Sequence, residues 1–215
     1  MKTTINDRLE RIAQYARDHL YQSASDQPEQ KHDPKYRWEH TLRVSNYGKI
    51  IAEEEGADVS VVVTACLLHD IAHFEPGVYK DHGRVGAAMS RELLEQMDFT
   101  SEQLDNICYS IAVHVDGEAG FKHEETPEAP CVSDADNIDR FGALRILMYC
   151  APELDDFFGL ANKLQERLET LEKYRRDQVL ETDSGNRLFN QQLDRQIEFF
   201  NTILCEKDRT ELPVI

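Results

Sequence analysis

The chain has 215 residues, which is enough for one domain with a substantial hydrophobic core. Apolar residues make up 40% and charged residues 30% of the sequence, the composition of an ordinary globular protein. The formal net charge of −17 would repel nucleic-acid phosphates and argues against long nucleic acid as a partner, although a small anion could still bind in a locally positive metal pocket.

The five cysteines argue against a chain held together by disulfide bonds. Their number is odd, their spacing is wide and no Cys-x-x-Cys motif occurs. We therefore expect reduced thiols and a cytoplasmic location. The segment from Met1 to Leu20 is too polar for a signal peptide, and no run of about 18 apolar residues indicates a membrane span, so no membrane partner is expected.

Helical periodicity dominates the sequence, and no alternating pattern indicates a strand. We therefore expect an all-α fold. Asp58 and Asp81 are the expected caps of the third and fourth helices, and a long loop is expected over 116–130. In chain order, the predicted helices cover residues 4–22, 35–54, 59–71, 82–97, 101–115 and 131–150, with two or three more over about 152–180 and 184–206.

Four histidines fall on inward faces of four different predicted helices. His40 and His82 each begin an apolar series at helical spacing, and His114 ends one. His69 lies on the most apolar helix of the chain. One inward histidine is usually a satisfied core residue, but four are hard to satisfy separately in one small core. Convergence on a cation is the simplest explanation, because neutral imidazoles bind Fe, Mn, Zn, Co and Ni well.

Two aspartates accompany these histidines. Asp70 lies in the apolar segment 67–72, where a buried charge needs a partner or a metal, and Asp136 lies in the segment 132–139. A metal would satisfy both. Asp134 could instead cap the sixth helix, and Asp139 could support a metal ligand or lie at the surface. We therefore rank Asp136 above both as a ligand.

The order of these residues resembles the HD superfamily of metal-dependent phosphohydrolases. The matching segments are LLHDIAH, DHGRVGAAMSRELLEQM, IAVH and VSDADNIDRFGALRIL, and the resemblance runs from about Trp38 to Met148. It implies a compact HD-type helical bundle with additional C-terminal helices. We accordingly expect one domain over 1–215, with its motif-bearing core at about 35–150.

The resemblance also implies a ligand set. One ion would take His40, His69, Asp70 and Asp136. A second ion, present in some members of the superfamily, would take His82 and His114, with Asp70 bridging the two. The expected cofactor is therefore one or two divalent ions from among Mn, Fe, Co, Ni, Zn and Mg.

The chain departs from several members of the superfamily one turn after the motif. Those members have a carboxylate there that assists proton transfer, whereas this chain has His73, with Glu75 nearby. We assign catalytic roles to Asp70 and His73. For His73, the alternatives are a metal ligand, a residue that supports a ligand, or a helix-end residue.

The function implied by the resemblance is hydrolysis of a small phosphoester, such as a nucleotide, by metal-bound hydroxide. Four basic residues are candidates for binding substrate phosphate, each with a solvent-facing charge as the alternative. They are Arg43, Lys80, Arg84 and Lys122.

Two other functions stay open at this point. The same six ligands occur in HD-type oxygenases with a di-iron centre, and a metal-occupied binding or regulatory protein would also need them. The last two helices could complete the bundle or form the face of a homodimer, because apolar periodicity is the same for both outcomes.

Overall fold

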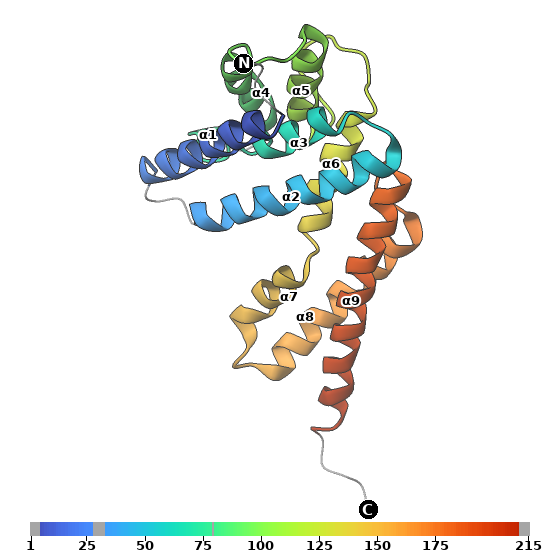
Figure 1. Ribbon diagram of the computed structural model, residues 1–215. Helices are drawn as coiled ribbons and strands as arrows, with labels where there is room; N and C mark the ends of the chain where they lie inside the picture. The colour runs from blue at the N-terminus through green and yellow to red at the C-terminus, as the bar shows by residue number, and fades with distance from the viewer. Residues whose placement is uncertain (1–4, 28–32, 79, 211–215) are drawn as a thin grey trace, which may run out of the picture. The chain divides into compact units, whose positions relative to one another are not determined.

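The computed structural model describes residues 5–27, 33–78 and 80–210 (Figure 1). Every regular element in those ranges is a helix, which confirms the predicted all-α fold. The chain divides into two compact units, residues 1–139 and residues 140–215. The expected motif-bearing core, 35–150, extends past this boundary, and the organisation as one domain stays a prediction.

The described part of the first unit contains six helices, and local side-chain chemistry explains where several of them begin. The Asp33 carboxylate accepts a hydrogen bond from the Lys35 amide at the start of the second helix, and Thr100 forms a capping box with Gln103. Asp58 accepts from the amides of Ser60 and Val61, as expected. The helices are α1 (Ile5–Ser25), α2 (Pro34–Glu55), α3 (Val59–Leu68), α4 (His82–Leu94), α5 (Ser101–Val113) and α6 (Glu128–Asp139).

Helix α3 is the central element of this unit. It packs against α1, α2, α5 and α6, and its residues from Val61 to Leu68 are buried except Val63. A helix that is apolar on every side belongs in the interior of a domain. The helix predicted over 59–71 ends at Leu68, and the chain continues in turns. The next two residues, His69 and Asp70, therefore lie in the centre of the unit, where they are 0% and 3% exposed.

Helix α2 approaches two neighbouring helices closely at Gly48. A Cβ atom there would lie 2.5 Å from Cys66 Sγ and 3.1 Å from Val62 Cγ1, both on α3, and 3.7 Å from Ala135 Cβ on α6. The absence of a side chain at Gly48 lets the three helices approach one another. The approach matters because α2, α3 and α6 carry or lead into predicted metal ligands.

Two expectations about the sixth helix are wrong, and one about the fourth helix is only partly right. The helix predicted over 131–150 is two helices, α6 and α7 (Ala143–Cys150), separated by a break at which Gly142 is the extended N-cap of α7. Asp134 does not cap a helix, because it lies inside α6 and is buried. Asp81 occupies the N-cap position of α4 but makes no cap hydrogen bond; its carboxylate accepts from Arg84 instead.

The second unit contains α7, a short 3-10 helix (Ala151–Glu153), α8 (Phe157–Asp177) and α9 (Asp183–Asp208). Helices α8 and α9 pack along each other, and the ring of Phe141 contacts those of Tyr174 and Phe189 between them. The helices predicted over 152–180 and 184–206 correspond to α8 and α9. Among the described residues, no helix is long and apolar enough to cross a membrane.

Replacing Gly48 with valine should destabilise the protein. The added side chain overlaps Cys66 and Val62, so the free energy of unfolding should fall by about 1–3 kcal/mol. Urea denaturation followed by circular dichroism measures the change. Lys49→Ala, at the exposed neighbouring position, should change stability by no more than about 0.5 kcal/mol. Equal stability of Gly48→Val and the wild type would contradict the close packing.

Candidate metal centre

The six predicted metal ligands lie together in the first unit, although they come from five elements. His40 lies on α2, His69 and Asp70 follow α3, His82 begins α4, His114 follows α5, and Asp136 lies on α6. Their ligand atoms, together with one from His73, form overlapping groups in which the atoms of each group lie within 4.8 Å of one another. The groups are His40, His69 and Asp136; His69, Asp70 and His114; and Asp70, His73 and His82.

Asp70 is the residue shared by the two sides of the cluster. Its Oδ2 atom lies 3.5 Å from His40 Nε2 and 3.3 Å from His69 Nε2. Its Oδ1 atom lies 3.3 Å from His82 Nε2 and 3.8 Å from His73 Nδ1. The two carboxylate oxygens therefore face different sets of imidazoles, as a carboxylate shared between two cations would.

Hydrogen bonds orient three of the histidines in the same way. His69 Nδ1 donates to the Cys66 carbonyl and His114 Nδ1 donates to the Ile111 carbonyl, both at 2.7 Å. His40 Nδ1 lies 2.7 Å from Asp139 Oδ2. A carbonyl oxygen only accepts, so the proton of each neutral ring is on Nδ1 and the Nε2 lone pair faces the cluster. Metal-binding histidines are usually held by such bonds.

This orientation brings the lone pairs of several acceptor atoms close together, and a cation bound between them would stabilise the arrangement. His40 Nε2 lies 3.3 Å from His69 Nε2 and 3.2 Å from Asp136 Oδ1. With both rings neutral, these atoms are all acceptors, and neither a polar hydrogen nor a positive charge separates them. Either a proton on His40 or a metal ion must lie between them. The donor set and its geometry fit a divalent cation.

The pKa values follow from the same arrangement. Burial alone would lower the pKa of His40, but hydrogen bonds with the surrounding carboxylates raise it to about 11. Burial likewise would raise the pKa values of Asp70 and Asp136, yet neighbouring imidazoles hold both well below the usual range, and Arg37 adds to the effect on Asp70. Burial lowers the pKa of His114 to about 4. At neutral pH the metal-free site therefore has ionised aspartates, neutral His114 and protonated His40.

Sequence reasoning missed Arg37, which lies one turn before His40 on α2. Its Nη1 donates to Asp70 Oδ2, and its Nη2 donates to His73 Nε2 at 3.0 Å. The guanidinium therefore supplies a fixed positive charge at the centre of the cluster. The spacing of three residues from His40 was the available signal, but a helix-surface arginine has the same spacing in many proteins.

Arg43 binds Asp139, and together they support His40. Arg43 Nε and Nη2 donate to the two oxygens of Asp139 at 2.6 and 3.1 Å, while Asp139 Oδ2 also faces His40 Nδ1. These contacts lower the pKa of the buried Asp139, against the effect of burial. A role for Arg43 in binding substrate phosphate stays a prediction, and it would require this ion pair to open.

The other predicted phosphate-binding residues lie outside the cluster. Arg84 donates to Asp81, to Asp116 and to the Glu118 carbonyl. Lys80 and Lys122 are exposed. Their roles in substrate binding stay predictions.

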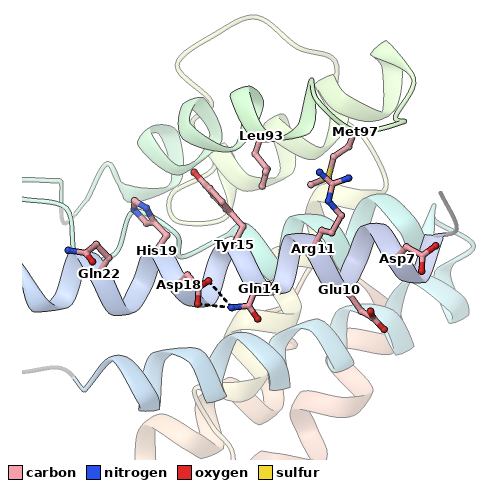
Figure 2. Close-up of a pocket in the computed structure, with 10 residues that line it drawn as sticks. All are labelled: Asp7, Glu10, Arg11, Gln14, Tyr15, Asp18, His19, Gln22, Leu93 and Met97. Atoms are coloured by element: carbon pink, nitrogen blue, oxygen red, sulfur yellow. Dashed lines mark hydrogen bonds between the residues drawn. The ribbon is translucent and has the colours of Figure 1, made fainter. Parts of the chain in front are cut away.

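A large groove runs along α1, beside the C-terminal end of α4 (Figure 2). Its volume is about 930 Å³, and Leu93 and Met97 form an apolar side opposite the polar side chains of α1. No predicted metal ligand lines it. The lining residues are Asp7, Glu10, Arg11, Gln14, Tyr15, Asp18, His19, Gln22, Leu93 and Met97.

The comparison with protein families agrees with the ligand arrangement. Residues 37–140 match the HD domain family, and this segment includes all six predicted ligands. This chain carries an HD domain. No curated protein matches the chain significantly.

Solved structures match the HD domain together with the flanking helices. An HD-superfamily hydrolase from Bacillus thuringiensis is 19% identical, with a TM-score of 0.67 over 97% of this chain and 100% of that one. A predicted HD-superfamily hydrolase from an uncultured Thermotogales bacterium is 21% identical, with a TM-score of 0.62 over 90% and 92%. Bacillus subtilis YpgQ in complex with ADP is 20% identical, with a TM-score of 0.60 over 94% and 98%. These likenesses show a common fold.

Metal binding to the HD domain should release a proton. Because the pKa of His40 is about 11 without metal, its ring is protonated at neutral pH and must lose that proton to bind a cation. The apparent affinity should therefore rise by about tenfold for each pH unit between about pH 6 and pH 9. Isothermal titration calorimetry with Mn²⁺ in buffers of different ionisation enthalpy measures both quantities. Affinity that does not change with pH would contradict a protonated His40.

Asp139→Asn should weaken metal binding without removing a ligand. The change removes the negative charge that orients His40 and that binds Arg43, so metal affinity should fall about 10- to 100-fold. Equilibrium dialysis with Mn²⁺ measures the loss. Asp105→Asn, which breaks a surface pair with Arg91, is the matched control and should retain wild-type affinity. A similar loss in both variants would show that Asp139 has no special connection to the site.

Proposed function

We propose that this HD-domain protein is a metal-dependent phosphohydrolase that acts on a small phosphorylated molecule, with nucleotides as the first candidates. The observation that carries the proposal is the clustering of the six predicted ligands, with Asp70 in two of the three groups and the Nε2 atoms of His40, His69 and His114 held toward the centre. One ion would take His40, His69, Asp70 and Asp136. A second would take His82 and His114 and share Asp70.

Bound divalent ions would supply an activated water and neutralise phosphate charge. The protein residues set the conditions for this chemistry. Asp70 and Asp136 stay ionised at neutral pH because the imidazoles around them lower their pKa values, so they provide negative charge without having to lose protons. The carbonyl partners of His69 and His114 keep those rings in the ligating tautomer.

His73 is the proposed hydrogen-bond donor to the leaving group of the substrate. Because a guanidinium only donates, its contact with Arg37 Nη2 requires an unprotonated Nε2 on His73, and the ring proton is therefore on Nδ1. That Nδ1 lies on the side of Asp70 that faces His82. His73 can thus donate a hydrogen bond from Nδ1 to the leaving oxygen of a phosphoester bound there, while solvent supplies the proton that this oxygen takes up.

Arg37 is the cation best placed to contact a substrate phosphate. Its side chain is 15% exposed, next to Asp70, and its Nε–H is buried without a hydrogen-bond partner among the described residues. An unsatisfied buried donor is costly, and a phosphate oxygen would satisfy it. Arg37 pairs with Asp70, the residue that the two proposed ions would share, whereas Arg43 pairs with Asp139 and Arg84 pairs with Asp81 and Asp116.

Two observations favour a small nucleotide over other phosphoesters. The related fold of Bacillus subtilis YpgQ was solved in complex with ADP. The net charge of −17 disfavours long nucleic acids, for which an extended basic surface is needed, but it does not disfavour a single nucleotide beside metal ions and Arg37.

Phosphate or pyrophosphate release from a panel of nucleotides and simple phosphoesters tests this function. Metal-stripped protein would be reloaded in turn with Mn, Mg, Co, Ni, Fe and Zn. We expect metal-dependent turnover that falls at least about 10³-fold in Asp70→Asn, because the change removes the shared charged ligand. Asp105→Asn, which alters a surface aspartate, should retain the wild-type rate.

Absence of turnover by folded, metal-loaded protein on the whole panel would contradict the proposal. Oxygen consumption by the iron-loaded protein is the next measurement in that case, because an HD-type oxygenase would use the same six ligands.

A further inference from the structure

The N-terminal end of α4 and the C-terminal end of α5 together supply the ligands of the proposed second ion. His82 is the first residue of α4, and His114 directly follows α5. Their ring centroids lie 5.1 Å apart. Since the two residues belong to different helices, their separation depends on how these two helix ends are held together.

Gly83 brings the two helix ends into direct contact. A Cβ atom at this position would lie 2.8 Å from the Ala112 carbonyl oxygen and 3.0 Å from the Ile111 carbonyl oxygen. Any side chain would therefore force the backbones apart. The Ile111 carbonyl is also the acceptor for His114 Nδ1, so the contact lies at the group that orients His114.

Arg84 joins the same two ends through its guanidinium. Nη2 donates to Asp81 Oδ1 at 2.6 Å, and Nη1 donates to Asp116 Oδ1 at 2.9 Å and to the Glu118 carbonyl at 2.7 Å. Arg84 lies two residues after His82, and Asp116 lies two residues after His114. The ion pair thus connects the backbones directly next to both ligands.

The chain after His114 turns so that it can meet Arg84. Gly117 and Gly120 have φ angles of 80° and 77°, in the left-handed region that favours glycine. An added Cβ at Gly120 would lie 3.1 Å from Arg84 Cδ. The loop therefore closes over the arginine stem, which explains why the guanidinium reaches both Asp116 and the Glu118 carbonyl.

The ligands of the proposed first ion are held by other contacts. His40 is supported by Asp139 and Arg43, and His69 by the Cys66 carbonyl at the end of α3. None of these contacts involves Arg84 or Asp116. A substitution at Arg84 should therefore alter the positions of the second-ion ligands, His82 and His114, and leave the ligands of the first ion in place.

We propose that Arg84 and Asp116 are positioning residues that set the separation of His82 and His114, and thereby determine whether a second divalent ion binds beside Asp70. The inference rests on the metal site of the proposed function. It assigns Arg84 to ligand geometry rather than to substrate phosphate.

Metal titration of the full chain tests this role, with Arg91→Ala as the matched control. Arg91 pairs with Asp105 at 2.8 Å and joins the same two helices away from the ligands. Mn²⁺ would be titrated into metal-free protein by calorimetry, and free Mn²⁺ would be counted by electron paramagnetic resonance. We expect two ions in the wild type and in Arg91→Ala. In Arg84→Ala the second ion should bind about 10- to 100-fold more weakly while the first keeps its affinity.

A conservative variant separates positioning from charge. Arg84→Lys keeps the positive charge but loses the fork that spans Asp81 and Asp116, so its second-ion affinity should fall between those of the wild type and Arg84→Ala. Circular dichroism of the metal-free proteins monitors folding. If Arg84→Ala does not fold, Asp116→Asn, which keeps the size of the side chain, takes its place.

Three results would overturn the inference: a single ion in the wild type, unchanged second-ion affinity in Arg84→Ala, or equal weakening of both ions. Phosphate release is measured separately. A wild type that binds two ions but hydrolyses no phosphoester would contradict the proposed function and leave the role of Arg84 standing. Hydrolysis with unchanged ion binding in Arg84→Ala would contradict the role of Arg84 alone.

Discussion

The carboxylate of Asp70 is the constraint on which the rest of the first unit depends. It lies at the end of α3, the most apolar helix of the chain, and is only 3% exposed. A buried carboxylate without positive partners would cost several kcal/mol or take up a proton. Here Arg37 and a ring of imidazoles hold its pKa low. The surrounding helices therefore direct polar side chains toward the Asp70 carboxylate, and elsewhere they pack against one another through apolar side chains.

Hydrogen bonds to protein acceptors orient three histidines of the cluster. Each of His40, His69 and His114 uses one ring nitrogen for a protein acceptor and directs the other at the centre. Two of these acceptors are backbone carbonyls three residues earlier in the chain, so the helix end that carries the histidine also orients it. The third is Asp139, which needs Arg43 as a partner because it is buried. The precision of the site thus comes largely from local helix geometry.

Hydrophobic periodicity made part of this arrangement predictable, because it indicates which face of each helix is buried. The apolar series through His40, His82 and His114 fixes which face of each helix is buried, and the unbroken apolar segment before His69 indicates a central helix. Both follow from the hydrophobic effect acting on regular backbone. The convergence of six side chains followed from these faces and from the resemblance to the HD superfamily.

The parts that could not be predicted depend on pairing between distant segments. Arg37 and Asp70 are 33 residues apart, and Arg43 and Asp139 are 96 apart, so nothing local distinguishes these arginines from solvated ones. The break between α6 and α7 was missed for a different reason. Apolar spacing continues through Gly142, and a single glycine within such a pattern does not by itself end a helix.

The spread of the six ligands along the chain has a thermodynamic consequence. They span residues 40–136 and tie five separate elements of the first unit to one point. An ion held there would act as a reversible cross-link that exists only in the folded chain. Its binding free energy would add to the free energy of unfolding, by about 2.7 kcal/mol at a free metal concentration 100 times the dissociation constant. The melting temperature of the protein would then rise with the free metal concentration around it.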